Sequence, residues 1–298
     1  MKIQALAVLA LTIAVPSNAT TYPVGISNCG VQSWIAQTPK RAVTLNQGTT
    51  EIMLALGLAD RMVGTAYLDD EIWPEIAEDY NSIPVLSDTY PDIDTLVSVN
   101  PDFLYASYRS AFQASKDGGD DKRIDYFDIL EACDLTMSTS RGNATYCRPE
   151  LHDKNIQTYL QTPHCEFEEH RPNEVTLSNL YEEIWDIALI FDAFEEAQVL
   201  VSNIEAHFQA ATNIVEQHGS EKPRVLWLDG WDPETPFVGS CCGSVQTIIE
   251  YSGAENIYAD LGLETKESWD DGNWKEIVEK DPDVIILVDA SWDAAGTL

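Results

Sequence analysis

The sequence predicts an α/β fold in which two Rossmann-like lobes are joined by a single long helix. A pattern of strand, helix, strand, and then a short helix stopped by Asn-Pro or Asp-Pro before a further strand occurs twice. The two copies have similar lengths, because Arg41 to Pro101 spans 60 positions and Arg224 to Pro282 spans 58. Strands that alternate with helices are typical of parallel sheets. The alternative is that two generic α/β segments match by chance.

The chain opens on a predicted export signal over residues 1–19. Lys2 provides a basic start, residues 3–15 form an apolar run of 13 residues, and Ser17 and Ala19 are small residues of the kind a signal peptidase reads. The run is shorter than a membrane span of about 20 residues. We therefore expect an exported protein, with a buried N-terminal helix as the alternative.

Residues 39–175 are predicted to form the N-terminal lobe. Its first two helices are expected to end at Gly57 and before Pro101. The predicted strands are 41–46, 62–66, 83–86 and 102–106, with a turn at 48–50 and helices at 51–56 and 93–99. Residues from about 110 to 172 are less regular and are interpreted as an expanded loop region, with a helix at 125–133 and a strand at 156–160.

Residues 176–219 are predicted to form linking helices. Apolar residues recur every three or four positions from Leu177 to Phe191 and again from Phe194 to His218. Neither glycine nor proline interrupts the second stretch before Gly219, and a helix of its 25 residues would be about 37 Å long. Such a helix is long enough to connect two lobes as a stiff strut, with two ordinary surface helices as the alternative.

Residues 223–298 are predicted to form the C-terminal lobe. The predicted strands are 224–229, 256–259 and 283–288, and the predicted helices are 245–251 and 274–279. Gly253 is expected to end the first of these helices and Pro282 to follow the second.

All six cysteines follow the predicted signal, and an even number in an exported chain favours disulfides. Cys133, Cys147 and Cys165 lie in one polar region, which favours a local bridge there. The adjacent Cys241 and Cys242 have three interpretations: a vicinal disulfide, separate bridges to distant cysteines, or a site for a soft metal. Disulfide chemistry is the favoured one.

The charge is strongly negative, with 17 Lys and Arg against 50 Asp and Glu and a formal net charge of −33. Binding of nucleic acid depends on basic residues that neutralise phosphates, so this class of partner is excluded. An anionic membrane surface is disfavoured for the same reason. The long-range field favours cationic partners, and slightly favours a neutral or cationic ligand.

Several segments carry a recognisable order of motifs. They are Pro39–Leu45 (PKRAVTL), Thr50–Gly57 (TEIMLALG), Arg61–Gly64 (RMVG), Asp94–Tyr105 (DTLVSVNPDFLY), Ile248–Tyr258 (IIEYSGAENIY) and Asp281–Ile286 (DPDVII). Together they resemble the ABC-type periplasmic substrate-binding proteins of the iron–siderophore and vitamin B12 class. The resemblance extends over about residues 36–109 and 174–293 and is carried by the order and spacing of the segments.

The resemblance implies the class III periplasmic-binding fold, with a ligand held between the lobes and no catalysis. It implies capture of a ferric siderophore, haem or cobalamin for uptake, with a membrane ABC permease as partner and no covalent cofactor. The family docks onto the permease through one carboxylate on each lobe, and the matching positions are Asp94 and Glu250; plain solvated charges are the alternative. We expect a monomer located in the periplasm, at the cell surface or outside the cell. Because the family's second lobe is usually longer, we expect the C-terminal lobe to be incomplete.

Candidate ligand contacts follow from topology, because open α/β sheets bind ligands beyond the carboxyl ends of their strands. The predicted ligand-binding residues are Thr49, Tyr67, Asp69, Tyr108, Arg109, Trp231, Asp232, Cys241, Cys242 and Trp292. Aromatic rings could sandwich a flat chelate, and Arg109 could meet an anionic one. The alternatives are that Thr49 caps its helix and that Trp231 and Trp292 pack between the lobes.

The sequence does not specify a metal site. A bare zinc site is not expected, because the five histidines lie between residues 152 and 218, away from the predicted strand ends. A bare ferric site built from Tyr67, Tyr105 or Tyr108 together with Asp69 or Asp232 is an open alternative.

A binding protein is the favoured class, since the sequence contains none of the common nucleophile, phosphate-loop or zinc-protease motifs. One alternative is a secreted acidic hydrolase that uses paired carboxylates, for example Asp69 and Asp70 with Asp232. With 50 acidic residues, however, such pairs are expected by coincidence. Another alternative is a cell-surface binding module that reuses the fold.

Overall fold

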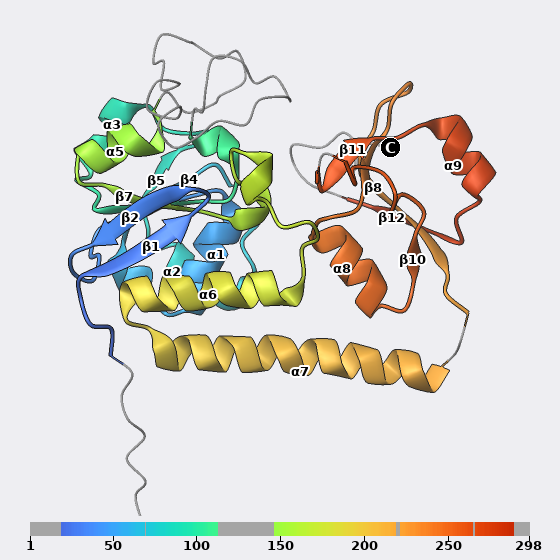
Figure 1. Ribbon diagram of the computed structural model, residues 1–298, viewed down its shortest axis with the longest axis horizontal. Coiled ribbons are helices and arrows are strands. Elements are labelled where there is room, and N and C mark those ends of the chain that lie inside the picture. The colour runs from blue at the N-terminus through green and yellow to red at the C-terminus, as the bar shows by residue number, and fades with distance from the viewer. Residues whose placement is uncertain (1–18, 69, 113–145, 219–220, 265, 289–298) are drawn as a thin grey trace, which may run out of the picture.

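The computed structural model describes residues 19–68, 70–112, 146–218, 221–264 and 266–288. These residues form two five-stranded sheets and one two-stranded hairpin. Figure 1 shows the two larger sheets side by side, with α7 running beneath both. We call the structure around the first sheet the N-terminal part and the structure around the second sheet the C-terminal part. The features predicted at residues 1–18, 69, 125–133 and 292 lie outside the described residues.

The first sheet is parallel throughout, as predicted. Its strands, in sheet order, are β5 (Val85–Ser87), β4 (Met62–Ala66), β3 (Ala42–Leu45), β6 (Phe103–Ala106) and β7 (Gln157–Leu160). All four residues of β3 are buried, because helices cover both faces of the sheet. The strand order runs outward from β3 in one direction through β4 and in the other through β6. The sheet therefore has a topological switch point between β3 and β6.

Helices cover this sheet in two layers. One layer contains α1 (Gln47–Ala55), α6 (Leu177–Phe191) and the start of α7 (Phe194–His218), and the other contains α3 (Ile93–Ser98) and α5 (Arg148–Asp153). The shorter connecting elements are η1 (Ala59–Arg61), η2 (Pro74–Ile76), α2 (Ala77–Tyr80), η3 (Arg109–Ala111), η4 (Thr162–His164) and η5 (Glu168–His170). Successive residues of β3 point to opposite layers, so Ala42 packs in the first layer and Val43 in the second.

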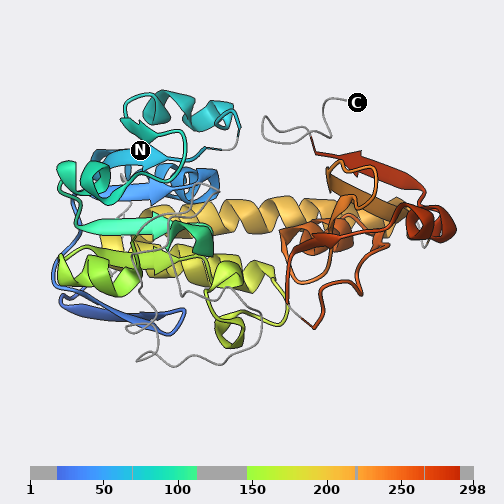
Figure 2. The ribbon, with the colours of Figure 1, turned by 90° about the horizontal axis from the view of Figure 1, so that it is seen from above.

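The two helices predicted within residues 176–219 are confirmed as α6 and α7. The backbone N–H of Thr176 donates to Asn179 Oδ1 at 2.9 Å, which caps the start of α6. Asp192 takes a left-handed backbone conformation at the end of α6, and α7 then runs for 25 residues without a break. It starts against α6 and ends beside the second sheet (Figures 1 and 2). Within the described ranges, no helix has both the length and the apolar character needed to cross a bilayer.

The second sheet is mixed, so the prediction of a wholly parallel sheet is wrong here. β8 (Arg224–Gly230) pairs in parallel with β10 (Glu255–Asn256) and β12 (Val284–Leu287), whereas β9 (Phe237–Gly239) is antiparallel to β8 and to β11 (Trp269–Asp271). Only residues 231–236 join β8 to β9, and such a short loop returns the chain antiparallel. The predicted helices are confirmed as α8 (Ser244–Tyr251) and α9 (Trp274–Lys280).

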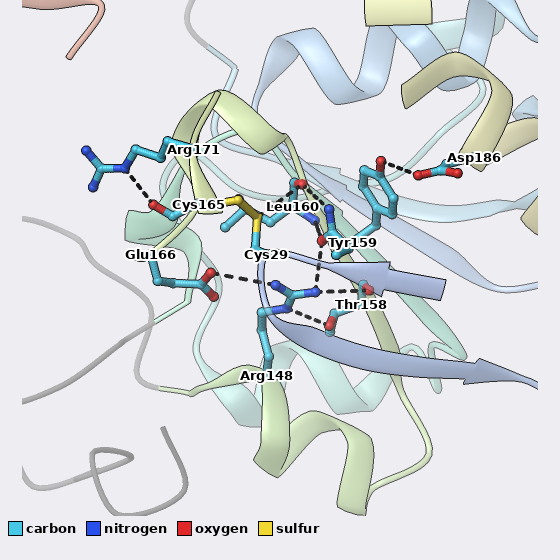
Figure 3. Close-up of a disulfide and its surroundings, with 10 residues drawn as sticks. Cys29, Arg148, Thr158, Tyr159, Leu160, Cys165, Glu166, Arg171 and Asp186 are labelled. Atoms are coloured by element: carbon cyan, nitrogen blue, oxygen red, sulfur yellow. Dashed lines mark hydrogen bonds and ion pairs between the residues drawn. A yellow bond between two sulfur atoms is a disulfide. The ribbon is translucent and has the colours of Figure 1, made fainter. Parts of the chain in front are cut away.

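A hairpin that the sequence analysis did not predict precedes the first sheet. It consists of β1 (Val24–Asn28) and β2 (Val31–Ile35), and alternate residues of β2 are buried although the exposed Trp34 breaks the apolar alternation in the sequence. A disulfide between Cys29 and Cys165 attaches its turn to the loop after β7 (Figure 3). Cys165 therefore pairs with a cysteine 136 positions away, not in a local bridge. Cys147 is also disulfide-bonded.

A buried arginine reinforces this attachment (Figure 3). The side chain of Arg148 is 1% exposed, and its guanidinium donates to Asn28 Oδ1 and Thr158 Oγ1, both at 2.9 Å. Its Nη1 lies 3.6 Å from the carboxylate of Glu166, which is 5% exposed. A buried charge is tolerated only when it is paired and hydrogen-bonded, so these contacts hold the hairpin, α5 and β7 in fixed positions.

Candidate functional site

The carboxyl ends of β3 and β6 meet at the switch point of the first sheet. Ser107 follows β6, and its backbone N–H donates to Leu45 O at 3.2 Å. Gly48 of α1 lies next to this strand end, since a Cβ at Gly48 would be in ordinary van der Waals contact with Ser107 Oγ, at 3.4 Å. Ser107 Oγ is buried and has no hydrogen-bond partner among the described residues. An unpaired buried hydroxyl is uncommon, and this one lies where open α/β sheets bind ligands.

Side chains from both parts meet next to this point. The first of them, Tyr108, directly follows Ser107 in the chain. Four belong to loops that follow β6 and β7 in the N-terminal part, and two lie at or just before β11 in the C-terminal part. We call this group the junction cluster, and it consists of Tyr108, Arg109, His164, Arg171, Glu267 and Trp269.

Two arginines of the junction cluster share one carboxylate oxygen. Arg171 Nη1 lies 2.8 Å from Glu267 Oε1, and Arg109 Nη1 lies 3.3 Å from the same oxygen. Arg171 Nε also donates to Cys165 O at 3.0 Å, so its guanidinium is oriented by the loop that carries the Cys29–Cys165 disulfide. The N-terminal part therefore presents two positive charges to the C-terminal part, despite the negative charge of the whole chain.

His164 lies between two aromatic rings of the junction cluster. Its ring centroid is 4.6 Å from that of Tyr108 and 6.1 Å from that of Trp269, with the Trp269 ring nearly parallel to it. Burial, followed by the positive charge of Arg109, lowers the pKa of His164 to about 4. The imidazole is therefore neutral at pH 7. Trp269 Nε1 is buried beside it without a hydrogen-bond partner among the described residues.

The loop after β9 supports the C-terminal side of the junction cluster. Cys241 and Cys242 form a vicinal disulfide, and both are 4% exposed. Ser240 Oγ donates to Glu267 O at 3.0 Å, and a Cβ on Gly243 would lie only 2.4 Å from Ser268 Cβ. The vicinal disulfide therefore shapes the loop that positions Glu267, and the two cysteines lie next to the junction cluster without belonging to it.

A polar cavity of about 290 Å³ lies beside the junction, between the β1–β2 turn, β7 and α6, and shares no residue with the junction cluster. Three carboxyl groups of α6 line it, those of Glu182, Glu183 and Asp186. Glu183 accepts hydrogen bonds from the Tyr105 hydroxyl and from Gln161 Nε2, and burial raises the pKa of Glu183 to about 7. Asp186 accepts from Tyr159 OH at 2.8 Å, and burial raises its pKa as well.

The predicted contacts from the first lobe are only partly brought together. Tyr108 and Arg109 belong to the junction cluster, and Tyr67 lies near the switch point, with its ring 4.5 Å from that of Tyr90. The prediction that Thr49 caps its helix is wrong. Thr49 lies inside α1, fully buried, and its hydroxyl donates to Leu45 O at 2.9 Å, while Asn46 occupies the N-cap position. Asp69 lies outside the described residues.

The predicted contacts after β8 do not join the junction cluster. Trp231 packs against Trp274 of α9 at a centroid distance of 4.6 Å, so it packs within the C-terminal part and not between lobes. Asp232 accepts from the backbone N–H groups of Glu234 and Thr235, which lower its pKa and close a turn. Figure 2 shows α9 at the end of the molecule distant from the first sheet. Trp292 lies outside the described residues.

Two candidates for the alternative ferric site, Tyr105 and Asp232, are engaged in other contacts, and Asp69 lies outside the described residues. Tyr105 is fully buried and donates to Glu183, and burial raises the pKa of Tyr105 well above its usual range. Asp232 lies in the turn after β8, away from the strand ends of the first sheet. Among the described residues, no group of three or more His, Cys, Asp or Glu side chains could hold a metal ion.

The two predicted docking carboxylates lie on opposite sides of the molecule. Asp94 is exposed on α3, above the first sheet in Figure 1. Glu250 is exposed on α8, which packs against α7 on the other side, with the Phe208 and Tyr251 rings 4.7 Å apart. The position in α9 that corresponds to Asp94 in α3 is Lys275, the second residue of the helix.

Sequence reasoning missed His164, Arg171, Glu267 and Trp269. The expectation that the histidines lie away from strand ends is wrong for His164, which follows the end of β7 by four positions. The strand at 156–160 was predicted, so its carboxyl end could have been added to the candidate loops. Arg171 and Glu267 carried no such signal, because 96 positions separate them along the chain.

Comparison with known proteins identifies the family. The model of the periplasmic binding protein family matches residues 134–296, more than half of the chain. A search of curated proteins gave no match. A periplasmic binding protein from Veillonella parvula is similar in structure, with a TM-score of 0.68, 23% identity, and coverage of 89% of this chain and 76% of that chain.

Two further solved structures share the fold. An ABC-type Fe3+-hydroxamate transport system from Saccharomonospora viridis has a TM-score of 0.64 and 20% identity, covering 89% of this chain and 79% of that one. The heme binding protein HmuT has a TM-score of 0.57 and 15% identity, covering 91% and 74%. At these sequence identities the solved structures establish only similarity of fold. The match to the family model establishes that the chain is a member of the family. The chain belongs to the periplasmic binding proteins of the iron–siderophore and vitamin B12 class.

Proposed function

We propose that this protein captures an iron chelate, haem or corrinoid that carries acidic groups, at the junction between its two parts. Membership of the family makes it a solute-binding protein for uptake and not an enzyme, so the alternative of a secreted hydrolase is set aside. The main evidence for an acidic ligand is the pair of arginines, Arg109 and Arg171, which face the C-terminal part. Such guanidinium groups recognise carboxylates by charge-assisted hydrogen bonds.

Other features of the junction support an acceptor-rich, partly aromatic ligand. Ser107 Oγ and Trp269 Nε1 are buried donors without partners among the described residues, so an incoming acceptor would satisfy them. Tyr108, His164 and Trp269 supply ring surfaces against which a flat chelate can stack. These local groups oppose the overall negative field, which by itself favours a neutral or cationic ligand.

The wider role follows from the family. We propose that residues 39–175 and 223–298 are the two lobes, that residues 176–219 link them, and that residues 1–19 direct export to the periplasm. The chain then acts as a monomer that delivers its ligand to a membrane ABC permease. Asp94 remains the docking candidate on the first lobe, because it is exposed at the start of α3.

A binding panel tests this proposal. Haemin, ferric siderophores with and without carboxylates, and cobalamin are titrated into the purified protein by calorimetry and tryptophan fluorescence. We expect saturable binding of at least one acidic chelate, and an Arg171→Gln variant should bind it about 10- to 100-fold more weakly, because a hydrogen bond to a charged group is lost.

Arg61→Gln is the matched control. It removes the same charge from η1, before the amino end of β4, where Arg61 pairs with Asp60 at 3.4 Å. The proposal fails if no member of the panel binds, or if both arginine variants weaken binding equally.

A further inference from the structure

Glu267 occupies the position that the acidic group of a ligand would take. Its Oε1 lies within 2.8 Å of Arg171 Nη1 and 3.3 Å of Arg109 Nη1. The arginines come from the N-terminal part and the glutamate from the C-terminal part, so this ion pair also joins the two parts. A carboxylate that bound Arg171 Nη1 and Arg109 Nη1 together would take the place of that of Glu267.

The three partners differ in how firmly they are held. The side chain of Arg171 is 8% exposed and is fixed from behind by its hydrogen bond to Cys165 O, whereas those of Glu267 and Arg109 are 34% and 47% exposed. The hydrogen bond from Ser240 Oγ holds the backbone carbonyl of Glu267 and not its side chain. The carboxylate of Glu267 can therefore leave by side-chain rotation, while the guanidinium of Arg171 keeps its orientation.

The charges also favour exchange. Two guanidinium groups share one carboxylate, so the three side chains keep a net positive charge at pH 7. Nearby, Ser107 Oγ and Trp269 Nε1 are buried donors that Glu267 does not satisfy. An external acid with further acceptor atoms would gain these hydrogen bonds in addition to the ion pairs.

We propose that Glu267 is an internal competitor. It closes the two parts together in the ligand-free protein and is displaced when the acidic group of the ligand binds Arg109 and Arg171. This inference rests on the proposed function and adds to it a self-inhibiting contact, which prevents weak anions from occupying the site. Because the internal ion pair and the ligand compete for the same arginines, any change that stabilises the ion pair lowers the affinity for the ligand correspondingly.

The test compares Glu267→Gln with the wild-type protein and with Glu264→Gln. Glu264 is exposed on the same loop, and no ion pair with an arginine is seen for it, so its variant removes the same charge nearby. The probes are haemin, which carries two propionates, and a ferric trihydroxamate without carboxylates. Glu267→Gln should bind haemin about tenfold more tightly than the wild type. This factor lies at the lower end of typical coupling between two binding events, because the ion pairs of Glu267 are partly exposed.

The controls decide between a local and a general effect. Glu264→Gln should change haemin affinity by no more than about twofold, and neither variant should change trihydroxamate affinity beyond that range. In an Arg109→Gln/Arg171→Gln background, adding Glu267→Gln should give no gain. Equal gains for both glutamate variants, or unchanged or weaker haemin binding by Glu267→Gln, would overturn the proposal.

A measurement without ligand separates this inference from the proposed function. Small-angle scattering should show a larger radius of gyration for Glu267→Gln than for the wild type and Glu264→Gln, because the ion pair between the parts is lost. If no probe binds any variant, the proposed function fails. If haemin binds but Glu267→Gln scatters like the wild type, the proposed function stands and the internal competitor is rejected.

Discussion

Glu183 is a buried carboxyl group whose replacement by glutamine should stabilise the protein at alkaline pH. Its side chain lies on α6, and the residue is 4% exposed. It accepts hydrogen bonds from Tyr105 and Gln161 through Oε1. Glutamine has nearly the same shape and keeps an oxygen in this position, so both donors remain satisfied in a Glu183→Gln variant.

The magnitude follows from the pKa. Burial raises the pKa of Glu183 from 4.5 to about 7, while the unfolded chain keeps the lower value. The folded protein therefore holds this proton more tightly, and its unfolding free energy falls as pH rises from about 4.5 to 7. A shift of this size corresponds to about 3 kcal/mol above pH 7. Glutamine does not ionise, so the variant should avoid this loss.

Urea unfolding at pH 5 and pH 8, followed by circular dichroism, measures the effect. The neighbouring Glu182→Gln is the control, because it removes a charge from an exposed position of the same helix and reports the general relief of negative charge. We expect the unfolding free energy of Glu183→Gln to exceed that of Glu182→Gln by about 2–3 kcal/mol at pH 8 and to differ little from it at pH 5. A gain that is independent of pH, or no greater than that of Glu182→Gln, would refute the reasoning.

Three further predictions concern the attachment of the β1–β2 hairpin. Replacing Cys29 and Cys165 together by serine should lower the unfolding free energy by about 2–4 kcal/mol in urea, and an unchanged midpoint would contradict a structural role for this disulfide. Arg148→Met should cost about 3–5 kcal/mol because it strands the carboxylate of Glu166, and adding Glu166→Gln should recover part of the loss; no recovery would show that the ion pair is not the cause. Burial, followed by the charge of Arg148, lowers the pKa of His152 to about 4, so its contribution to stability is present above about pH 6.5 and is lost as pH falls to 4. His152→Gln should therefore flatten the fall in unfolding free energy over that interval by about 1–2 kcal/mol, and an unchanged slope would refute the assignment.

Most strands and helices of the two copies could be predicted, because their signals are local. Periodic apolar residues located α6 and α7, and apolar runs located β4 and β6. The start of α1 was missed, because glycine and two threonines at 48–50 suggest a turn. In the structure, Asn46 takes a left-handed backbone conformation that turns the chain from β3 directly into the helix.

The antiparallel elements were the main omission in the fold. The β1–β2 hairpin and the β9–β11 pair are short, and their stability depends on contacts with residues far away in the sequence, such as the disulfide between Cys29 and Cys165. Periodicity over three to five residues carries little information about such strands.

Only the residues of the candidate site that directly follow β6 could be predicted from the sequence. Tyr108 and Arg109 could be chosen because they follow a predicted strand, and the rule about carboxyl ends applies to sequence directly. Trp231 and Asp232 satisfied the same rule but lie elsewhere, because the turn after β8 folds toward α9. A rule about strand ends does not say in which direction a loop leaves the sheet.

The sequence by itself determined the α/β class, the repeated pattern, the long helix that is α7 and the family, since each depends on residues that are close together in the chain or on their order. Only the tertiary structure decided which side chains meet at the junction. Arg109 and Glu267 are 158 positions apart, and Arg171 and Glu267 are 96 positions apart. Their ion pairs exist because α7 and the loops around His164 and Trp269 bring the two sheets side by side.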